Sequence, residues 1–162
     1  MSRRPNIPSR PARGPKPLPV SFRRPAAEIA TDEIEFRAAL DNVIAGSKDP
    51  ADVARLATAA MYCARTVQAL LDDPRLDRVE LNGLHPAILA GAEAIDALDK
   101  RLRAAGFAKA SSAERDALAG LLSVLGELDR VATGRQQRDA MNRVVDDAAR
   151  ARRERENGGT HG

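Results

Sequence analysis

The sequence of 162 residues predicts an all-α protein: a four- to five-helix bundle with a disordered, basic Pro/Arg-rich N-terminal tail and a short disordered C-terminal tail. Apolar residues recur every three or four positions through most of the chain after residue 30, which is the spacing of helices buried along one face. The three prolines outside the N-terminal tail, Pro50, Pro74 and Pro86, all fall at boundaries of these stretches. Hydrophobic residues make up 43% of the chain but aromatic residues only 2%, so alanine and leucine must form the core.

Residues 1–30 are predicted to form the N-terminal tail. Seven of the ten prolines lie in residues 1–27, where they remove backbone donors too often for a helix or sheet and favour extended chain. The same stretch carries seven cations and no acidic residue, and these are the candidate nucleic-acid-binding residues: Arg3, Arg4, Arg10, Arg13, Lys16, Arg23 and Arg24. Phe22 is the only aromatic residue in this stretch, so bases have little to stack on. The cations therefore predict salt-dependent contacts to phosphates, without preference for a nucleotide sequence. A solvated tail that binds nothing explains the same composition.

The predicted bundle, residues 31–149, begins with two helices. The hydroxyl of Thr31 is a capping group for the first, and Gly46 is suited to end it. Residues 50–73 form the second, because Asp49 supplies a cap, Pro50 suits the first turn, and a proline follows at position 74. The apolar stripes are Phe36, Leu40, Val43 and Ile44 in the first helix, and Val53, Leu56, Ala57, Ala60, Ala64, Val67, Leu70 and Leu71 in the second.

The middle of the chain contains a third long helix. Residues 75–83 fit either one helical turn or an irregular bridge. Asn82 or His85 is the expected cap of the next helix, with Pro86 in its first turn and Gly106 at its end. Its stripe comprises Ile88, Leu89, Ala92, Ile95, Leu98 and Leu102.

Two capping boxes mark the remaining helices. Ser111 with Glu114 begins a leucine-rich helix, in which Gly120 and Gly126 either permit close packing or mark a bend. Thr133 with Gln136 begins another, which ends in the Arg-rich helix end and disordered tail of residues 150–162.

The leucine-rich helix also holds the candidate partner-binding residues: Leu121, Leu122 and Leu125. They widen its apolar stripe beyond what an alanine-rich neighbour covers, and an exposed apolar patch usually marks an interaction site. We therefore expect a protein partner, or a two-fold homodimer through this face. The alternative is a monomer in which Phe36 and Leu40 of the first helix cover the leucines.

No catalytic residue, cofactor or metal site is predicted. Cys63 is expected at the edge of a buried stripe centred on Leu56 and Val67, as a small hydrophobic residue. His85 and His161 have no zinc-ligand spacing with it, and a Cys63–His85 nucleophile–base pair lacks a third orienting group. The acidic pairs at residues 72–73 and 146–147 are expected to be solvated, so we predict that the protein is not an enzyme.

Charge and targeting signals complete the prediction. Residues 1–27 carry +7 and residues 150–162 carry +2; subtracting both from the net charge of +3 leaves −6 for residues 28–149. No apolar run approaches the roughly 18 residues of a membrane span, and the N-terminus lacks the apolar segment of an export signal. Arginine outnumbers lysine by 22 to 4, as in chains encoded by GC-rich genomes, so we expect a bacterial, cytoplasmic protein.

These observations predict a non-catalytic protein-interaction module with a regulatory or accessory role, which binds a partner protein or itself through amphipathic helices. The alternative is a nucleic-acid-associated accessory protein that uses its basic N-terminal tail for non-specific phosphate contacts.

Overall fold

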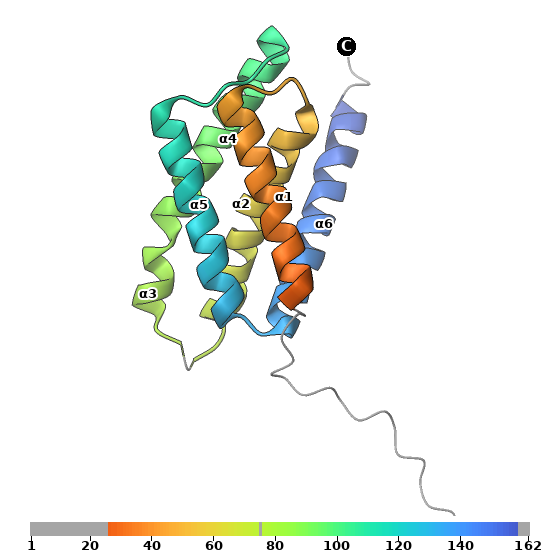
Figure 1. The fold of residues 1–162 in the computed structure, drawn as a ribbon. Coiled ribbons are helices and arrows are strands. Elements are labelled where there is room, and N and C mark those ends of the chain that lie inside the picture. The colour runs from red at the N-terminus through yellow and green to blue at the C-terminus, as the bar shows by residue number, and fades with distance from the viewer. Residues whose placement is uncertain (1–25, 75, 159–162) are drawn as a thin grey trace, which may run out of the picture.

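The computed structural model describes the backbone of residues 26–74 and 76–158, and the predicted all-α bundle is confirmed (Figure 1). The helices are α1 (Ala26–Ala45), α2 (Pro50–Leu71), α3 (Arg78–Gly83), α4 (His85–Ala105), α5 (Ser112–Val131) and α6 (Gly134–Gly158). Within the described residues there is no strand, and one isolated antiparallel bridge joins Ser47 to Ala108.

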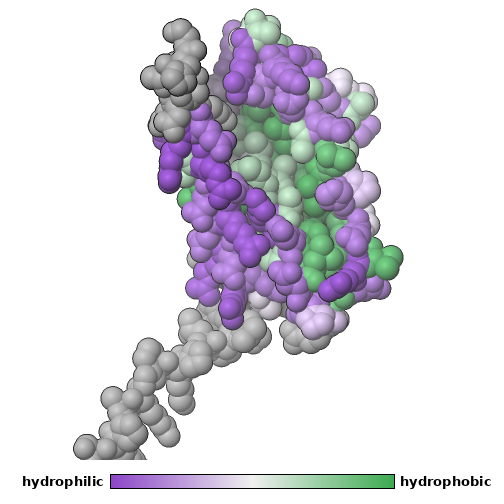
Figure 2. Space-filling view, turned by 180° about the vertical axis from the view of Figure 1, so that it is seen from behind, coloured by the Kyte–Doolittle hydropathy of each residue, from purple (hydrophilic) through white to green (hydrophobic). Residues whose placement is uncertain are grey.

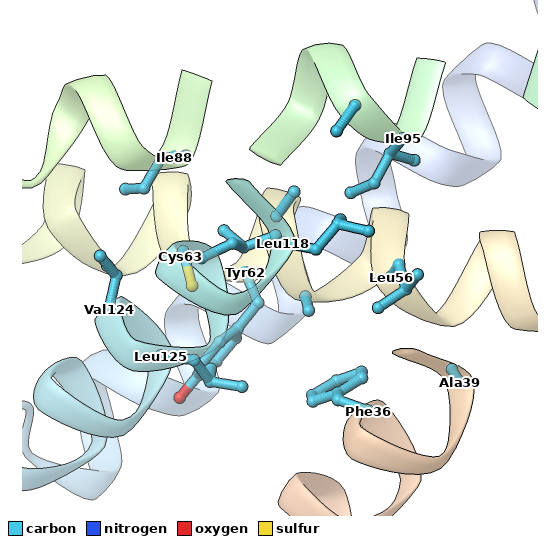
Figure 3. Packing of buried hydrophobic residues seen from close by; sticks show 14 of the residues in the cluster. Phe36, Ala39, Leu56, Tyr62, Cys63, Ile88, Ile95, Leu118, Val124 and Leu125 are labelled. Carbon is cyan, nitrogen blue, oxygen red and sulfur yellow. The ribbon is translucent and has the colours of Figure 1, made fainter. Parts of the chain in front are cut away.

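Helix α2 is the centre of the bundle. It packs against α1, α4, α5 and α6, while α4 and α5 also pack closely on each other. In Figure 1, α2 and α5 run opposite to α1, α4 and α6, so that neighbouring helices are mostly antiparallel. Fully buried leucines form the centre of the core, with alanines and valines between them: Leu56, Leu70, Leu98, Leu118, Leu121 and Leu128. Figure 3 shows Leu56 and Leu118 in this packing.

The predicted caps of α2, α5 and α6 are confirmed. Asp49 accepts a hydrogen bond from the N–H of Ala51 at 2.9 Å. Ser111 and Glu114 make both bonds of a capping box, and so do Thr133 and Gln136. These side chains satisfy backbone N–H groups that have no partner within their helix.

Two predictions at helix starts differ from the structure, and one of the two alternatives left open for residues 75–83 is found. Helix α1 begins at Ala26 rather than at Thr31, because alanine and glutamate before Thr31 are good helix formers. The ambiguous residues 75–83 contain the short helix α3, which is capped by Asp77. Neither Asn82 nor His85 caps α4: Leu84 occupies the cap position without a side-chain bond, because α3 leads into α4 with almost no connection.

Two connections pair at one end of the bundle. Ser47, between α1 and α2, exchanges two backbone hydrogen bonds of 2.8 Å with Ala108, between α4 and α5. Gly46 has a φ of 109°, and a Cβ built there would lie 2.4 Å from the ring of Phe107. Glycine is therefore required at position 46 both for its backbone conformation and for the close approach of Phe107.

Cys63 lies inside the buried face of α2, so its predicted position at the edge of the stripe is wrong. The Cys63 side chain is fully buried, whereas Ala64 is exposed and Ala57 half-buried. Leu56 and Val67 are buried as predicted. Cys63 is seven residues from both Leu56 and Leu70 and therefore shares their face of the helix. Helix α5 covers the side of α2 that bears Tyr62 and Cys63 (Figure 3).

Candidate partner-binding groove

An apolar groove of about 830 Å³ runs between α4 and α6, with α2 as its floor. Figure 2 shows it from behind as a pale and green floor between hydrophilic flanks. The floor residues are Pro50, Val53, Ala54, Ala57, Thr58, Ala60 and Met61. Ala92, Ile95, Asp96, Asp99 and Arg103 form the α4 wall, and Asp147, Ala148, Ala151 and Arg152 form the α6 wall.

The floor follows from the alanines on one side of α2. Ala54 and Ala57 lie three residues apart and therefore share a face of the helix. Their short side chains leave the space between the α4 and α6 walls unfilled, although both walls pack on α2. The only floor hydroxyl, that of Thr58, donates to the backbone carbonyl of Ala54 at 2.9 Å. The floor therefore offers an apolar surface close to the α2 backbone.

Exposed apolar residues extend both walls. Leu89 is 52% exposed and precedes Ala92 by three residues on α4. Val145 is 60% exposed and precedes Ala148 by three residues on α6. Residues three apart on a helix lie on one face, so each wall continues its apolar surface by one turn.

Charges are divided between the two ends of the groove. Asp147 of α6 pairs with Arg65, which follows Met61 on α2. Asp147 therefore lies at the Met61 end of the groove. Arg152 follows one turn later, toward the Pro50 end. On α4, Asp96 and Asp99 precede Arg103, and the residues after α4 pair with Ser47 near Pro50. The lining carboxylates Asp96 and Asp147 therefore lie toward the Met61 end, and the lining arginines Arg103 and Arg152 lie toward the Pro50 end.

Each aspartate in the walls is held by a cation. Lys100 Nζ lies 2.6 Å from Asp96 Oδ2, and this hydrogen bond and charge raise the pKa of Lys100 above its ordinary value. Arg103 lies 2.8 Å from Asp99 Oδ2. Among the described residues, no group of three or more His, Cys, Asp or Glu side chains is placed to hold a metal ion.

A partly buried polar cluster links α6 to the rest of the bundle. Asp129 on α5 accepts hydrogen bonds from the Tyr62 hydroxyl at 3.1 Å and from Gln137 Nε2 at 3.2 Å. One carboxylate therefore joins α2, α5 and α6. Burial, and secondarily the charge of Asp129, raises the pKa of the Cys63 thiol to about 12. The thiol is protonated and fully buried while His85 is exposed, so these two residues do not form a nucleophile–base pair.

The leucines predicted as a partner surface are not exposed. Leu121 is fully buried, Leu125 is buried and Leu122 is half-buried. Leu121 packs directly against Gly91, where an added Cβ would lie 2.8 Å from the leucine Cβ. The sequence-based argument did not foresee that Gly91, which has no side chain, lets α4 pack closely on the leucines of α5. A homodimer through Leu121 and Leu125 would need this face to be uncovered.

The seven candidate nucleic-acid-binding cations, Arg3, Arg4, Arg10, Arg13, Lys16, Arg23 and Arg24, lie outside the described residues. The groove itself was not predicted, because its parts belong to three helices that pattern analysis treats one at a time. Only the run of small residues in α2 pointed toward it.

Within the described part of the chain, no helix combines the length and apolarity that a membrane crossing requires. Comparison with protein-family models, with curated proteins and with solved structures found no match.

Proposed function

We propose that the protein is a non-catalytic interaction module with a regulatory or accessory role, and that it binds an amphipathic helix of a partner protein in the groove between α4 and α6. The observation that carries this proposal is the alanine floor of α2 lying open between two helical walls. Helix-in-groove binding is a recurrent mode of recognition, in which apolar side chains at helical spacing anchor the ligand.

The shape of the groove favours a helix over other ligands. Its floor runs along α2 from Pro50 to Met61 between two helical walls, so an elongated ligand such as a helix can lie along it. Neighbouring helix axes lie about 8–10 Å apart, and short floor residues such as Ala54 and Ala57 permit an approach at the lower end of that range. Leu89 and Val145 supply apolar contacts beyond the Met61 end.

The charges of the walls favour one orientation of the bound helix. A helix carries partial positive charge at its N-terminus and partial negative charge at its C-terminus. Its N-terminus is therefore favoured beside Asp96 and Asp147, and its C-terminus beside Arg103 and Arg152. The bound helix runs antiparallel to α2, and its preferred sequence is basic in the first half and acidic in the second. Exposed ion pairs contribute little, about 1 kcal/mol or less each, so charge selects orientation while apolar burial supplies affinity.

The lining supports binding rather than chemistry. Its polar side chains are three aspartates, two arginines and one threonine, and each aspartate already pairs with a cation. A general base or nucleophile requires a group poised to change its protonation state, which paired surface carboxylates do not provide.

The test uses a display library of 18-residue amphipathic peptides, selected on the full chain and then measured in solution by fluorescence anisotropy. Ala54→Trp places a large side chain in the groove from an exposed position, and Ala119→Trp is the matched control on the exposed face of α5. We expect selected peptides to bind the Ala54→Trp variant at least ten-fold more weakly than the wild type, and the control unchanged. Failure to select any binder, or equal loss in both variants, would overturn the proposal.

A further inference from the structure

A second apolar pocket, of about 390 Å³, lies between α3 and the C-terminal half of α5. Its apolar residues are Leu76, Leu81, Leu84, Leu128 and Val131. Val131 is 51% exposed, so part of this apolar surface is open to solvent. The pocket shares no lining residue with the groove between α4 and α6.

The rim of this pocket is acidic. Asp77, Glu80 and Glu127 line it, and no described lining residue is basic. One oxygen of Asp77 caps α3 by accepting from the N–H of Val79 at 2.7 Å. Glu80 and Glu127 are both exposed on the rim. An apolar pocket with such a rim suits a ligand that is apolar at its centre and basic at its ends.

We propose that this pocket binds residues 16–24 of the same chain. In that segment Leu18, Val20 and Phe22 alternate with other residues, so an extended chain presents all three on one face. Lys16 lies at one end and Arg23 and Arg24 at the other. The prolines at positions 17 and 19 favour the extended form and reduce the entropy lost on binding.

The length of the chain permits this contact. The described structure begins with α1 at Ala26, and α1 packs antiparallel to α5, so Ala26 lies at the end of the bundle where α5 finishes (Figure 1). Leu18 precedes Ala26 by eight residues, which span at most about 26–29 Å when extended. Crossing from the α1 axis to the far side of α5 takes roughly 15–20 Å, given packed axes about 8–10 Å apart and helices about 10–12 Å wide.

The direction of the chain follows from the same distances. Arg23 and Arg24 are nearest to Ala26 and therefore meet Glu127 on α5. Lys16 is farthest and meets Asp77 and Glu80 on α3. Because the segment is tethered, its effective concentration is on the order of millimolar, so a modest intrinsic affinity suffices. The contact weakens with added salt because the rim charges are exposed.

The test compares methyl NMR spectra of full-length variants. A triple variant, Leu18→Ser, Val20→Ser and Phe22→Ser, removes the apolar face of the segment, and Ile7→Ser is the matched control in the same tail. We expect the triple variant to shift the methyl signals of Leu81, Leu128 and Val131 by more than a linewidth, with Val53 in the groove unchanged. The control leaves all four signals in place.

Two further measurements keep the inference falsifiable. The double variant Glu80→Gln and Glu127→Gln, and separately 0.5 M salt, should move the Leu81 and Leu128 signals toward their positions in the triple variant. Unchanged pocket methyls in the triple variant would overturn the proposal. So would wild-type pocket shifts that change on dilution, because they would assign the occupant to a second copy of the chain. Neither result depends on the groove or on its partner helix.

Discussion

The backbone of Gly91 in α4 lies directly against the side chain of Leu121 in α5: a Cβ added to the glycine would stand 2.8 Å from the leucine Cβ. This contact covers the leucine face of α5. Around Gly120 and Gly126, by contrast, an added Cβ meets no heavy atom within 4 Å. The close approach that the sequence suggested for those two glycines occurs at Gly91 instead.

Gly91→Ala should destabilise the protein although alanine is the better helix former. Overpacking a core costs about 1–3 kcal/mol, and the gain in helix propensity is only about 1 kcal/mol. Gly120→Ala is the matched control and should raise the free energy of unfolding by up to about 1 kcal/mol, because its Cβ enters open space. Urea unfolding of the two variants measures both effects. Equal stabilisation by both would show that α4 and α5 are farther apart than described.

Leu121→Ala should lower the free energy of unfolding by about 2–5 kcal/mol without changing the mass of the particle in solution. The side chain is fully buried inside one chain, so its removal leaves a cavity rather than disrupting an interface. Chemical unfolding combined with light scattering separates these outcomes. A wild-type dimer that dissociates in the Leu121→Ala variant, with little loss of stability, would restore the interface predicted from sequence.

Cys63 makes stability fall at high pH. Burial raises its pKa in the folded state from the ordinary value of 9.0 to about 12, so between these two pH values the unfolded chain loses a proton that the folded chain retains. The contribution of Cys63 is complete below pH 9 and declines by at most about 1.4 kcal/mol per pH unit above it. Unfolding free energies from pH 8 to 11 should show this extra slope in the wild type and not in Cys63→Ala. Identical slopes would mean that the thiol ionises freely in the fold.

Helix α6 should open before the rest of the bundle. It packs mainly on α2, and its ion pair with α2, between Arg65 and Asp147, is only partly buried. Hydrogen exchange should therefore be faster in α6 than in α2. Asp147→Asn should accelerate exchange in α6, whereas Asp139→Asn, which affects an exposed pair within α6, should not. If hydrogen exchange in α6 is as slow as in α2 in both variants, α6 does not open first and the prediction is wrong.

The elements could be predicted from sequence because their signals are local. Asp49 and Ser111 stand directly before the first residues of α2 and α5, and both cap their helices as expected. The stripe of α2 was assigned less accurately. Cys63 lies seven residues after Leu56 and seven before Leu70, so periodicity itself puts it on the buried face, whereas the stripe chosen from sequence included its exposed neighbour Ala64.

The candidate groove could not be predicted, because tertiary packing decides whether it stays open. Ala54 and Ala57 read equally well as a packing surface for another helix of the bundle, which is how alanine stripes are usually buried. Whether α4 and α6 close over them depends on the angles at which those helices cross α2, and no local residue pattern specifies these angles. For the leucine face of α5 the outcome is the opposite: it was expected to be exposed, but it is covered. The glycine that allows α4 to pack closely on it, Gly91, lies in a different helix.

The central claim, that the groove between α4 and α6 binds a helix antiparallel to α2, is tested most directly by paramagnetic quenching. A selected peptide carries a spin label at its N-terminus, and methyl intensities of the full-length protein are recorded with the label oxidised and then reduced. The account predicts strong loss of signal at Leu89 and Val145, beyond the acidic end of the groove, and little loss at Val79 on α3. Quenching at Val79 with Leu89 and Val145 unaffected would place the peptide elsewhere and contradict the account.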